Sequence, residues 1–384
     1  MQRSETRATC PAAGNLFHRT FIGQAAVEAV PFDLRPTRPP GHSHISVVPL
    51  LLDTRQVIAF LGVPANAGCP RRTAWIEKRG WSGSARMHGG GLLWHGKHVY
   101  CEKPLANDAA SARQMYEAVR SAGCIHAVSF SYRLWPAVAF AQQLLDDGAI
   151  GKVLQFHARY LHEFALDPQT PLMWRGVAAK AGSGSLGDVG SHLIDMARHL
   201  VGEIVRVSAR MWTFVNRRPL PAGSDTGIGK DAAVGSSDYG PVDVDDAAVL
   251  MVEFEDGTLG IIETNWMAAG HFGQSFEISG ERGAIRFNWE HRTELQIWLA
   301  GDPPDLAGFR TIQIGPKHPE AAPYGPIPGF GMSQRDAFCI TVHEVIDAVA
   351  NNRPARQDFF DGLRACEVID AAKRSSESGA WENV

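Results

Sequence analysis

The chain has 384 residues, of which 45% are hydrophobic and 20% charged, as is ordinary for a globular protein of about two domains. Its formal net charge of −4 gives no reason to expect a nucleic-acid partner. No apolar run reaches the roughly twenty residues that a membrane span requires, and the first residues lack the apolar segment of a secretion signal. We therefore expect a cytoplasmic protein without a membrane partner.

The cysteines also point to a reducing compartment. They contain no CxxC pair and no spacing typical of a metal site, which favours free thiols over disulfides or zinc ligands. They are Cys10, Cys69, Cys101, Cys124, Cys339 and Cys366.

The first 95 residues lack the regular pattern of a folded domain. Ile45–Leu52 and Val57–Gly62 have the composition of strands, although Pro49 interrupts the first of them. The surrounding sequence is rich in Pro, Arg and Gly without periodicity, and residues 1–95 carry eleven Lys or Arg against five Asp or Glu. A basic surface for phosphate groups is one interpretation, and sequence of atypical origin is the one that we favour.

A regular pattern begins at Lys97. The run Val99–Tyr100 predicts a buried strand that ends at the tripeptide EKP, residues 102–104, and strand ends are where α/β proteins carry out chemistry. Next, Asn107 or Asp108 is suited to cap a helix that ends at Gly123. A strand is predicted at 125–131.

The remaining sequence predicts a second domain. After a helix from Pro136 to Asp147, long alternating segments indicate an open, mostly antiparallel sheet with one covered face. We expect strands at 152–163, 204–215, 247–254, 258–266, 276–279, 284–288, 294–299 and 311–314, and helices at 336–351 and 360–376. Residues 217–242 are too long for a simple connector, which leaves a lid, a partner contact or an irregular loop as interpretations.

A helix that begins near Gly187 carries the main group of polar residues. Asp188, His192, Asp195 and His199 follow at helical spacing and fall on one face, with apolar residues on the other. We interpret Asp195 and His199 as helix-surface groups or as supports for the first pair. The preceding residues 182–187 read G-S-G-S-L-G, which matches a dinucleotide fingerprint, but no apolar strand precedes them as such a site requires.

Lys103, Asp188 and His192 together supply a cation, a carboxylate and an imidazole. A lone lysine is more often solvated and a lone histidine more often packed. However, Pro104 stiffens the chain after Lys103, and Asp188 gives His192 a carboxylate neighbour that would orient or charge it. The set suits removal of a proton from a hydroxyl group.

These motifs resemble those of the Gfo/Idh/MocA oxidoreductases, which include glucose-fructose oxidoreductase and inositol dehydrogenases. The EKP and GDVGSHLID motifs place Lys103 and Asp188 85 residues apart, and SYRLWPAV at 131–138, the dipeptide at 174–175 and the segment 353–375 extend the resemblance to about three quarters of the chain. The resemblance implies an α/β plus α+β fold. A Rossmann-like domain at 1–131 would bind NAD or NADP, and a substrate and oligomerisation domain would occupy 132–384.

The resemblance also implies an activity. It indicates an NAD(P)-dependent oxidoreductase that oxidises a secondary hydroxyl of a sugar, anhydrosugar or cyclitol. Asp188 and His192 would form the acid/base pair, and Lys103 would contact the substrate hydroxyl and the nicotinamide. A homodimer or homotetramer is expected, formed through the exposed face of the sheet.

Several other residues receive roles from the same resemblance. Glu102, Trp174 and Arg175 are expected beside the cofactor, although structural packing explains the Trp-Arg pair equally well. Tyr132 and His162 are further candidates for sugar contacts.

The N-terminal segment departs from the family pattern. Phe21-Ile22-Gly23 resembles the end of its glycine-rich fingerprint, so Gly23 is a candidate for the dinucleotide, but His18 and Thr20 stand where the first two glycines belong. Our hypothesis is that much of 40–94, with the first twenty residues, is translated out of the ancestral frame or otherwise degraded. Translation of the DNA in the other two frames tests it, and the absence of a family-like strand and turn there would contradict it. A divergent but intact nucleotide domain is the alternative.

Two further functions stay open from the sequence. One is a catalytically inactive remnant that binds a polyol or self-associates without a dinucleotide, which titration with NADH and NADPH would reveal. The other is a metal-dependent isomerase or hydrolase. His343-Glu344 begins a zinc motif, but Asp347 stands where its second histidine is needed, so we predict no metal site.

Overall fold

The computed structural model describes residues 46–47, 58–62, 98–221, 235–325, 327 and 331–384. The strands expected at 45–52 and 57–62 correspond to β1 (Ser46–Val47) and β2 (Ile58–Gly62). Gly23 lies outside the described residues, as does most of the segment to which the hypothesis of a lost reading frame applies. In the part of the chain that is described, no helix is long and apolar enough to cross a membrane.

A small sheet contains the strand that leads to Lys103. Its order is β1-β2-β3-β4, where β3 is His98–Cys101 and β4 is His126–Val128. β3 and β4 are parallel and joined by helix α1 (Ala109–Ala122), a crossover of the nucleotide-binding type. The predicted caps are confirmed: Asp108 accepts from the Ser111 amide, and Gly123 ends the helix with φ of 60°.

The large sheet has nine strands, in the order β14-β13-β12-β11-β5-β10-β9-β6-β15. Of its strand pairs, β5 and β10 are parallel and the others antiparallel, which confirms the open, mostly antiparallel sheet. The strands are β5 (Val153–His162), β6 (Ile204–Trp212), β9 (Ala247–Phe254), β10 (Leu259–Asn265), β11 (Phe272–Gly280), β12 (Gly283–Asn288), β13 (Glu294–Leu299), β14 (Arg310–Gln313) and β15 (Glu382–Asn383).

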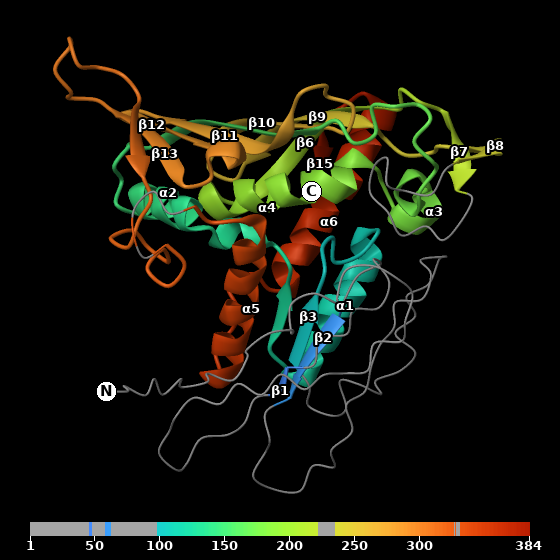
Figure 1. Cartoon of the computed structure of the whole chain (residues 1–384), viewed down its shortest axis with the longest axis horizontal. Coiled ribbons are helices and arrows are strands. Elements are labelled where there is room, and N and C mark those ends of the chain that lie inside the picture. Colours follow the sequence, from blue (N-terminus) through green and yellow to red (C-terminus); the bar gives the residue numbers. More distant parts are fainter. Residues whose placement is uncertain (1–45, 48–57, 63–97, 222–234, 326, 328–330) are drawn as a thin grey trace, which may run out of the picture.

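Helices cover one face of this sheet. Figure 1 shows α2 (Pro136–Asp146), α4 (Ser191–Leu200) and α6 (Phe359–Ser378) on that face, while α5 (Gln334–Ala350) runs from it toward the small sheet. Side chains between helices and sheet form the core, and Phe156, Phe254 and Leu193 are almost completely buried there. No helix among the described residues covers the opposite face (Figure 1).

The expectation of an irregular loop at 217–242 is wrong for both of its ends. β7 (Arg217–Pro221) and β8 (Gly235–Pro241) pair as an antiparallel ribbon. Arg218 on β7 is 5% exposed and donates to the backbone carbonyls of Ala165 and Asp167, which holds the ribbon against the segment after β5. The proline and glycine residues of β7 and β8 prevented their prediction as strands, because both residues are rare within sheets.

The strand expected at 125–131 is shorter in the structure. β4 stops at Val128, and a 3-10 turn, η2 (Ser131–Leu134), leads into α2. This turn brings Tyr132 and Arg133 beneath α4, where both are buried. The division into domains at residue 131 stays a prediction.

Candidate active site

Lys103 and Asp188 meet although 85 residues separate them. β3 ends at Cys101, and two residues later Lys103 Nζ donates to the backbone carbonyl of Asp188 at 2.5 Å and to its carboxylate Oδ1 at 2.9 Å. The two side chains are 17% and 22% exposed, so the ion pair lies in a cleft rather than on the open surface. The small sheet and the helical layer are therefore joined at the predicted site.

The helix that carries Asp188 starts with a π-helical turn. This turn, η4 (Leu186–Gly190), contains Asp188 and passes directly into α4, whose second residue is His192. The sequence predicted a regular helix from Gly187, so the wide turn is a correction. π turns often occur at functional sites, where the extra residue redirects side chains and carbonyls.

Two cations surround the Asp188 carboxylate. In addition to Lys103, Arg175 Nε lies 3.4 Å from Oδ2. Burial by itself would raise the pKa of Asp188, but the charges of Lys103 and Arg175 outweigh it and hold that pKa well below its usual range. Asp188 is therefore ionised wherever the protein is folded near neutral pH.

His192 is buried among aromatic rings. It is 7% exposed, and its ring centroid lies 4.5 Å from Tyr132 and 6.3 Å from Tyr160. Burial, reinforced by the charge of Lys103, lowers the pKa of His192 well below its usual value, so the ring is neutral near pH 7. Within the described chain neither ring nitrogen makes a hydrogen bond. Because the Asp188 oxygens face Lys103 and Arg175, Asp188 acts on this imidazole through its charge.

Of the looser candidates for substrate contacts, Tyr132 lies against His192, and His162 is close enough to Asp188 to sense its charge. The Tyr132 hydroxyl is 3.0 Å from that of Tyr160 on β5. His162 ends the same strand, with its ring 5.6 Å from Phe272, and burial lowers its pKa. Tyr160 was not singled out from the sequence, although alternation along β5 places it on the same face as His162.

Asp195 is not a surface group, which corrects one of the two interpretations of it. It is 1% exposed and accepts from the guanidinium of Arg133, with Nε to Oδ2 at 2.9 Å. Arg133 also donates to Asp361 on α6 at 3.0 Å. Asp195 therefore fastens α4, the helix that carries His192, to the layer beneath it, as the alternative of a supporting residue anticipated.

A cleft of about 230 Å³ lies beside the ion pair. Its lining includes Glu102, Lys103, Pro104, Trp174, Arg175 and Asp188. Arg175 belongs to a short 3-10 turn and its guanidinium lies 4.6 Å from the Trp174 ring, so an aromatic surface and two cationic donors border one space. These groups fit the nicotinamide ribose end of a dinucleotide, which presents a flat ring, an amide and two hydroxyls.

Asp245 holds the turn that precedes Asp188. Its carboxylate accepts from the amides of Gly184 and Leu186 and from the Ser185 hydroxyl, each at 2.7 Å. A Cβ on Gly184 would lie 1.9 Å from the Asp245 carbonyl oxygen, so only glycine fits there. The G-S-G-S-L-G string therefore serves close packing against Asp245. The sequence carries a signal for this contact, namely the pair of aspartates at 245–246 directly before an apolar strand. The signal was missed because the groups that Asp245 binds lie some sixty residues earlier in the chain.

Asp245→Asn is expected to destabilise the protein and to lower kcat. Burial raises the pKa of Asp245 to about 6, its three donors oppose that rise, and the group is a carboxylate near neutral pH. Asparagine replaces one carboxylate oxygen, a hydrogen-bond acceptor, with an NH₂ group, a donor that faces the N–H groups of the turn. This mismatch should lower the free energy of unfolding by about 1–3 kcal/mol. Urea unfolding and steady-state kinetics measure both effects, with Asp305→Asn on the exposed surface as the control. Unchanged stability and kcat would contradict this role.

The fold and this cleft define a class of protein. A parallel βαβ unit presents a lysine just after its strand end, and a helix on the covered face of the open sheet carries the carboxylate that binds this lysine and, one turn later, a neutral imidazole among aromatic rings. Together they form the site of a nicotinamide-dependent dehydrogenase.

Comparison with known proteins identifies the family. Residues 86–130 match the oxidoreductase-family NAD-binding Rossmann fold, and residues 138–286 match the GFO/IDH/MocA C-terminal domain. The chain is 40% identical over 290 residues to the levoglucosan dehydrogenase of Pseudarthrobacter phenanthrenivorans, covering 75% of this chain and 74% of that one. It is 28% identical to the myo-inositol 2-dehydrogenase of Thermotoga maritima, over 73% and 71% of the two chains.

A solved structure agrees with these matches. Levoglucosan dehydrogenase in complex with NADH and L-sorbose superposes with a TM-score of 0.72 and 39% identity over 76% of this chain and 75% of that one. The chain therefore belongs to the Gfo/Idh/MocA family and is an NAD(P)-dependent oxidoreductase. The predicted fold class, cofactor and enzyme class are confirmed, and the alternative of an inactive remnant is not favoured.

Proposed function

We propose that this enzyme oxidises a secondary hydroxyl of a sugar or anhydrosugar of the levoglucosan type. The observation that carries the proposal is the ion pair of Lys103 and Asp188 at the cleft, with His192 one helical turn after Asp188 and within electrostatic range of both charges. The 40% identity to levoglucosan dehydrogenase supports an anhydrosugar over a cyclitol. Other sugars and cyclitols are weaker candidates because the inositol dehydrogenases are less similar.

In the proposed reaction His192 is the general base. A neutral imidazole nitrogen without a hydrogen-bond partner in the described chain accepts the proton as the substrate O–H bond breaks. The ammonium of Lys103, fixed by its two bonds to Asp188, donates to the same oxygen and stabilises the charge that develops there. Bound NAD(P)+ supplies the acceptor for the hydride that leaves the carbon. The C–H electron pair departs as the C=O double bond forms.

The remaining groups hold the reactants in the cleft. Glu102, Lys103, Trp174 and Arg175 border the nicotinamide ribose, and Asp188 keeps the cations in place. Tyr132 and His162 contact the sugar. This assignment is supported by the contact of the Tyr132 ring with His192 and by the place of His162 at the end of β5.

The function is tested by NAD(P)+ reduction with a panel of polyols. Levoglucosan, glucose, L-sorbose and myo-inositol are each added to the purified protein with NAD+ or NADP+, and NAD(P)H absorbance is followed. We expect turnover with levoglucosan above the others. Calorimetry with NADH and NADPH accompanies the assay. Binding of a dinucleotide without turnover of any polyol would contradict the proposed substrate class, and no binding at millimolar concentration would support the remnant.

The pH profile should follow the proposed base. His192 is active when neutral, and because its pKa is lowered, protonation takes place only below the usual value of 6.5. We therefore expect kcat/KM to be constant through neutral pH and to fall only at pH values well below 6.5. Stopped assays between acidic and neutral pH check this. A decline that begins above pH 7 would indicate a different base.

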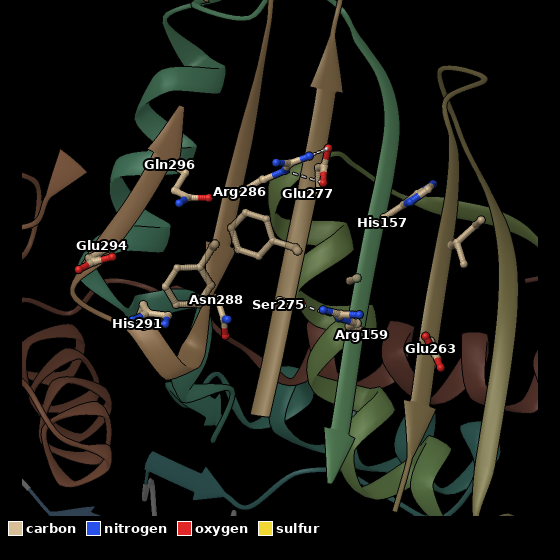
Figure 2. A pocket seen from close by; sticks show the side chains of 14 residues that line it. His157, Arg159, Glu263, Ser275, Glu277, Arg286, Asn288, His291, Glu294 and Gln296 are labelled. Carbon is tan, nitrogen blue, oxygen red and sulfur yellow. Dashed lines mark hydrogen bonds and ion pairs between the residues drawn. The ribbon is translucent and has the colours of Figure 1, made fainter. Parts of the chain in front are cut away.

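We further propose a homodimer or homotetramer formed through the uncovered face of the large sheet. Val249, Met251, Leu259 and Ile261 form an apolar patch on β9 and β10, and each is at least 36% exposed. Beside it lies a groove of about 540 Å³ that carries both charge signs; Figure 2 shows Arg286 paired with Glu277, with Arg159 and Glu263 alongside. Both features suit a twofold contact, which is self-complementary.

Met251→Glu is expected to disrupt this assembly. A twofold contact would bury two like charges in an apolar patch, which weakens association at least about 100-fold. Size-exclusion chromatography with light scattering measures the mass of the wild type and the variant. Leu306→Glu, at a 72% exposed position outside the patch, is the control. A monomeric wild type, or an unchanged mass in Met251→Glu, would contradict the proposal.

A cytoplasmic location is the last part of the proposal. It is supported by Cys101, Cys124, Cys339 and Cys366, which are free thiols, as is usual in reducing compartments. Fractionation of cells that express the tagged full chain tests it, and recovery outside the cytoplasm would contradict it.

A further inference from the structure

One buried polar side chain near the site has no role in the steps above. Gln274 on β11 is 3% exposed and alternates with Phe276 and Ile278, which are buried under the helices. Strand register places Gln274 directly opposite Tyr160 on β5. Facing residues of an antiparallel pair have Cβ atoms about 5 Å apart, so Gln274 lies beside this tyrosine.

Tyr160 connects Gln274 to the proposed base. The Tyr160 hydroxyl is 3.0 Å from that of Tyr132, whose ring centroid lies 4.5 Å from His192 and 4.5 Å from Trp289. Trp289 follows β12, whose last residue faces Ser275, the neighbour of Gln274 on β11. Gln274 therefore has Tyr160 of strand β5 on one side. On its other side lies Trp289, the residue that follows the end of β12.

The amide of Gln274 is unsatisfied. Its Nε2 is buried and has no hydrogen-bond acceptor among the residues described. A buried donor without an acceptor is unfavourable, and nearly all such groups in native proteins pair with protein, water or a ligand. The position thus provides a hydrogen-bond donor to an oxygen that the described chain does not supply.

The covered face is open at the end of these strands. Two residues before Gln274, Phe272 stands opposite His162 on the same face, and their ring centroids are 5.6 Å apart. Although helices cover this face elsewhere, Phe272 is 52% exposed. Gln274 is therefore the next inward-facing residue along β11 behind this exposed ring.

We infer that Gln274 is a substrate-binding residue whose Nε2 donates a hydrogen bond to an oxygen of the polyol, while the rings of Phe272 and Trp289 pack against its C–H groups. The inference rests on the proposed oxidation of a polyol and adds a group that selects among polyols. A buried donor discriminates strongly against a ligand that lacks the matching oxygen, because the donor is then left unpaired. The aromatic walls supply the apolar contact that a sugar ring requires.

The test compares Gln274→Met, which keeps the length of the side chain and removes the amide, with Gln313→Met on the edge strand β14 as the control. For levoglucosan we expect Gln274→Met to lower kcat/KM roughly 10–100-fold, mainly through KM. The affinity for NADH, followed by fluorescence, should stay unchanged. Deoxy analogues identify the oxygen: the analogue that lacks it should be used equally well by wild type and Gln274→Met.

Two results overturn the inference. One is a kcat/KM of Gln274→Met within about twofold of the wild type for every polyol. The other is an equal loss of polyol and NADH binding, which would indicate general disruption. If Gln274→Met does not fold, Gln274→Asn, which withdraws the amide by one methylene group, is judged by the same thresholds.

Failure of the proposed function has a different signature. The wild type itself would then reduce NAD(P)+ with none of the polyols. In that case calorimetry with the same polyols and NADH-bound protein decides about Gln274. Tighter binding by the wild type than by Gln274→Met supports the inference, and equal or absent binding overturns it.

Discussion

Replacing His192 with asparagine is expected to reduce kcat by roughly 10²–10⁴-fold, the range that a general base contributes. Asparagine keeps a polar side chain at the position but cannot accept a proton near neutral pH. The hydroxyl proton then loses the acceptor that we propose for it. NADH affinity should be unaffected, because the described cofactor cleft is lined by other residues.

The matched control for this change lies on the same helix. His199, two turns further along α4, is half-buried, and its pKa is lowered to about 4, chiefly by burial. His199→Asn should therefore reproduce any general disturbance of α4 while leaving the chemical step intact. Steady-state kinetics and thermal unfolding of both variants separate the two effects. A His192→Asn enzyme within about fivefold of the wild-type kcat would exclude His192 as the base.

Replacing Lys103 with methionine is expected to lower kcat/KM by roughly 10²–10³-fold, as observed when a donor to a developing oxyanion is removed. Methionine retains the length of the side chain and loses the ammonium. The loss leaves Asp188 with Arg175 as its nearby cation, so the pKa of Asp188 should rise toward its usual range. Both the substrate oxygen and the carboxylate lose their partner.

Two further variants sharpen this test. Lys152→Met, at an exposed position before β5, controls for the removal of a positive charge. Lys103→Arg retains the charge but presents a planar fork, so it should restore only part of the activity. A stronger recovery in Lys103→Arg than in Lys103→Met supports a direct electrostatic role. Equal activity of Lys103→Met and wild type would rule it out.

Local sequence signals located most of the secondary structure. Asp108 and Gly123 mark the ends of α1 because a capping carboxylate and a left-handed glycine act within one turn of the helix. Alternation located β9 at its observed bounds for the same reason, since the period of two is a property of the strand itself. Segments with proline and glycine, such as β7 and β8, were missed because their pairing depends on a partner strand.

The site was predicted less evenly than the fold. Lys103, Asp188 and His192 carry recognisable motifs, and the structure brings them together. Asp245 and Gln274 belong to no recognisable motif, because the role of each depends on its contacts with residues on other elements. The spacing of Asp195 left a surface position and a supporting role open, and its contact with Arg133 from a separate turn decides for the supporting role.

The sequence by itself determined most helices and strands from residue 98 onward, apart from segments such as β7 and β8, together with the family and the three polar groups of the site, because these follow from short periodic patterns and motifs. Tertiary structure alone decided that Lys103 lies against Asp188, that the helix carrying Asp188 begins with a π turn, and that Nε2 of Gln274 is buried without a partner among the described residues. The physical reason is the distance along the chain that separates the residues that interact. Periodicity and capping depend on neighbours within one or two turns, whereas ion pairs and strand register depend on how elements far apart in the chain pack together.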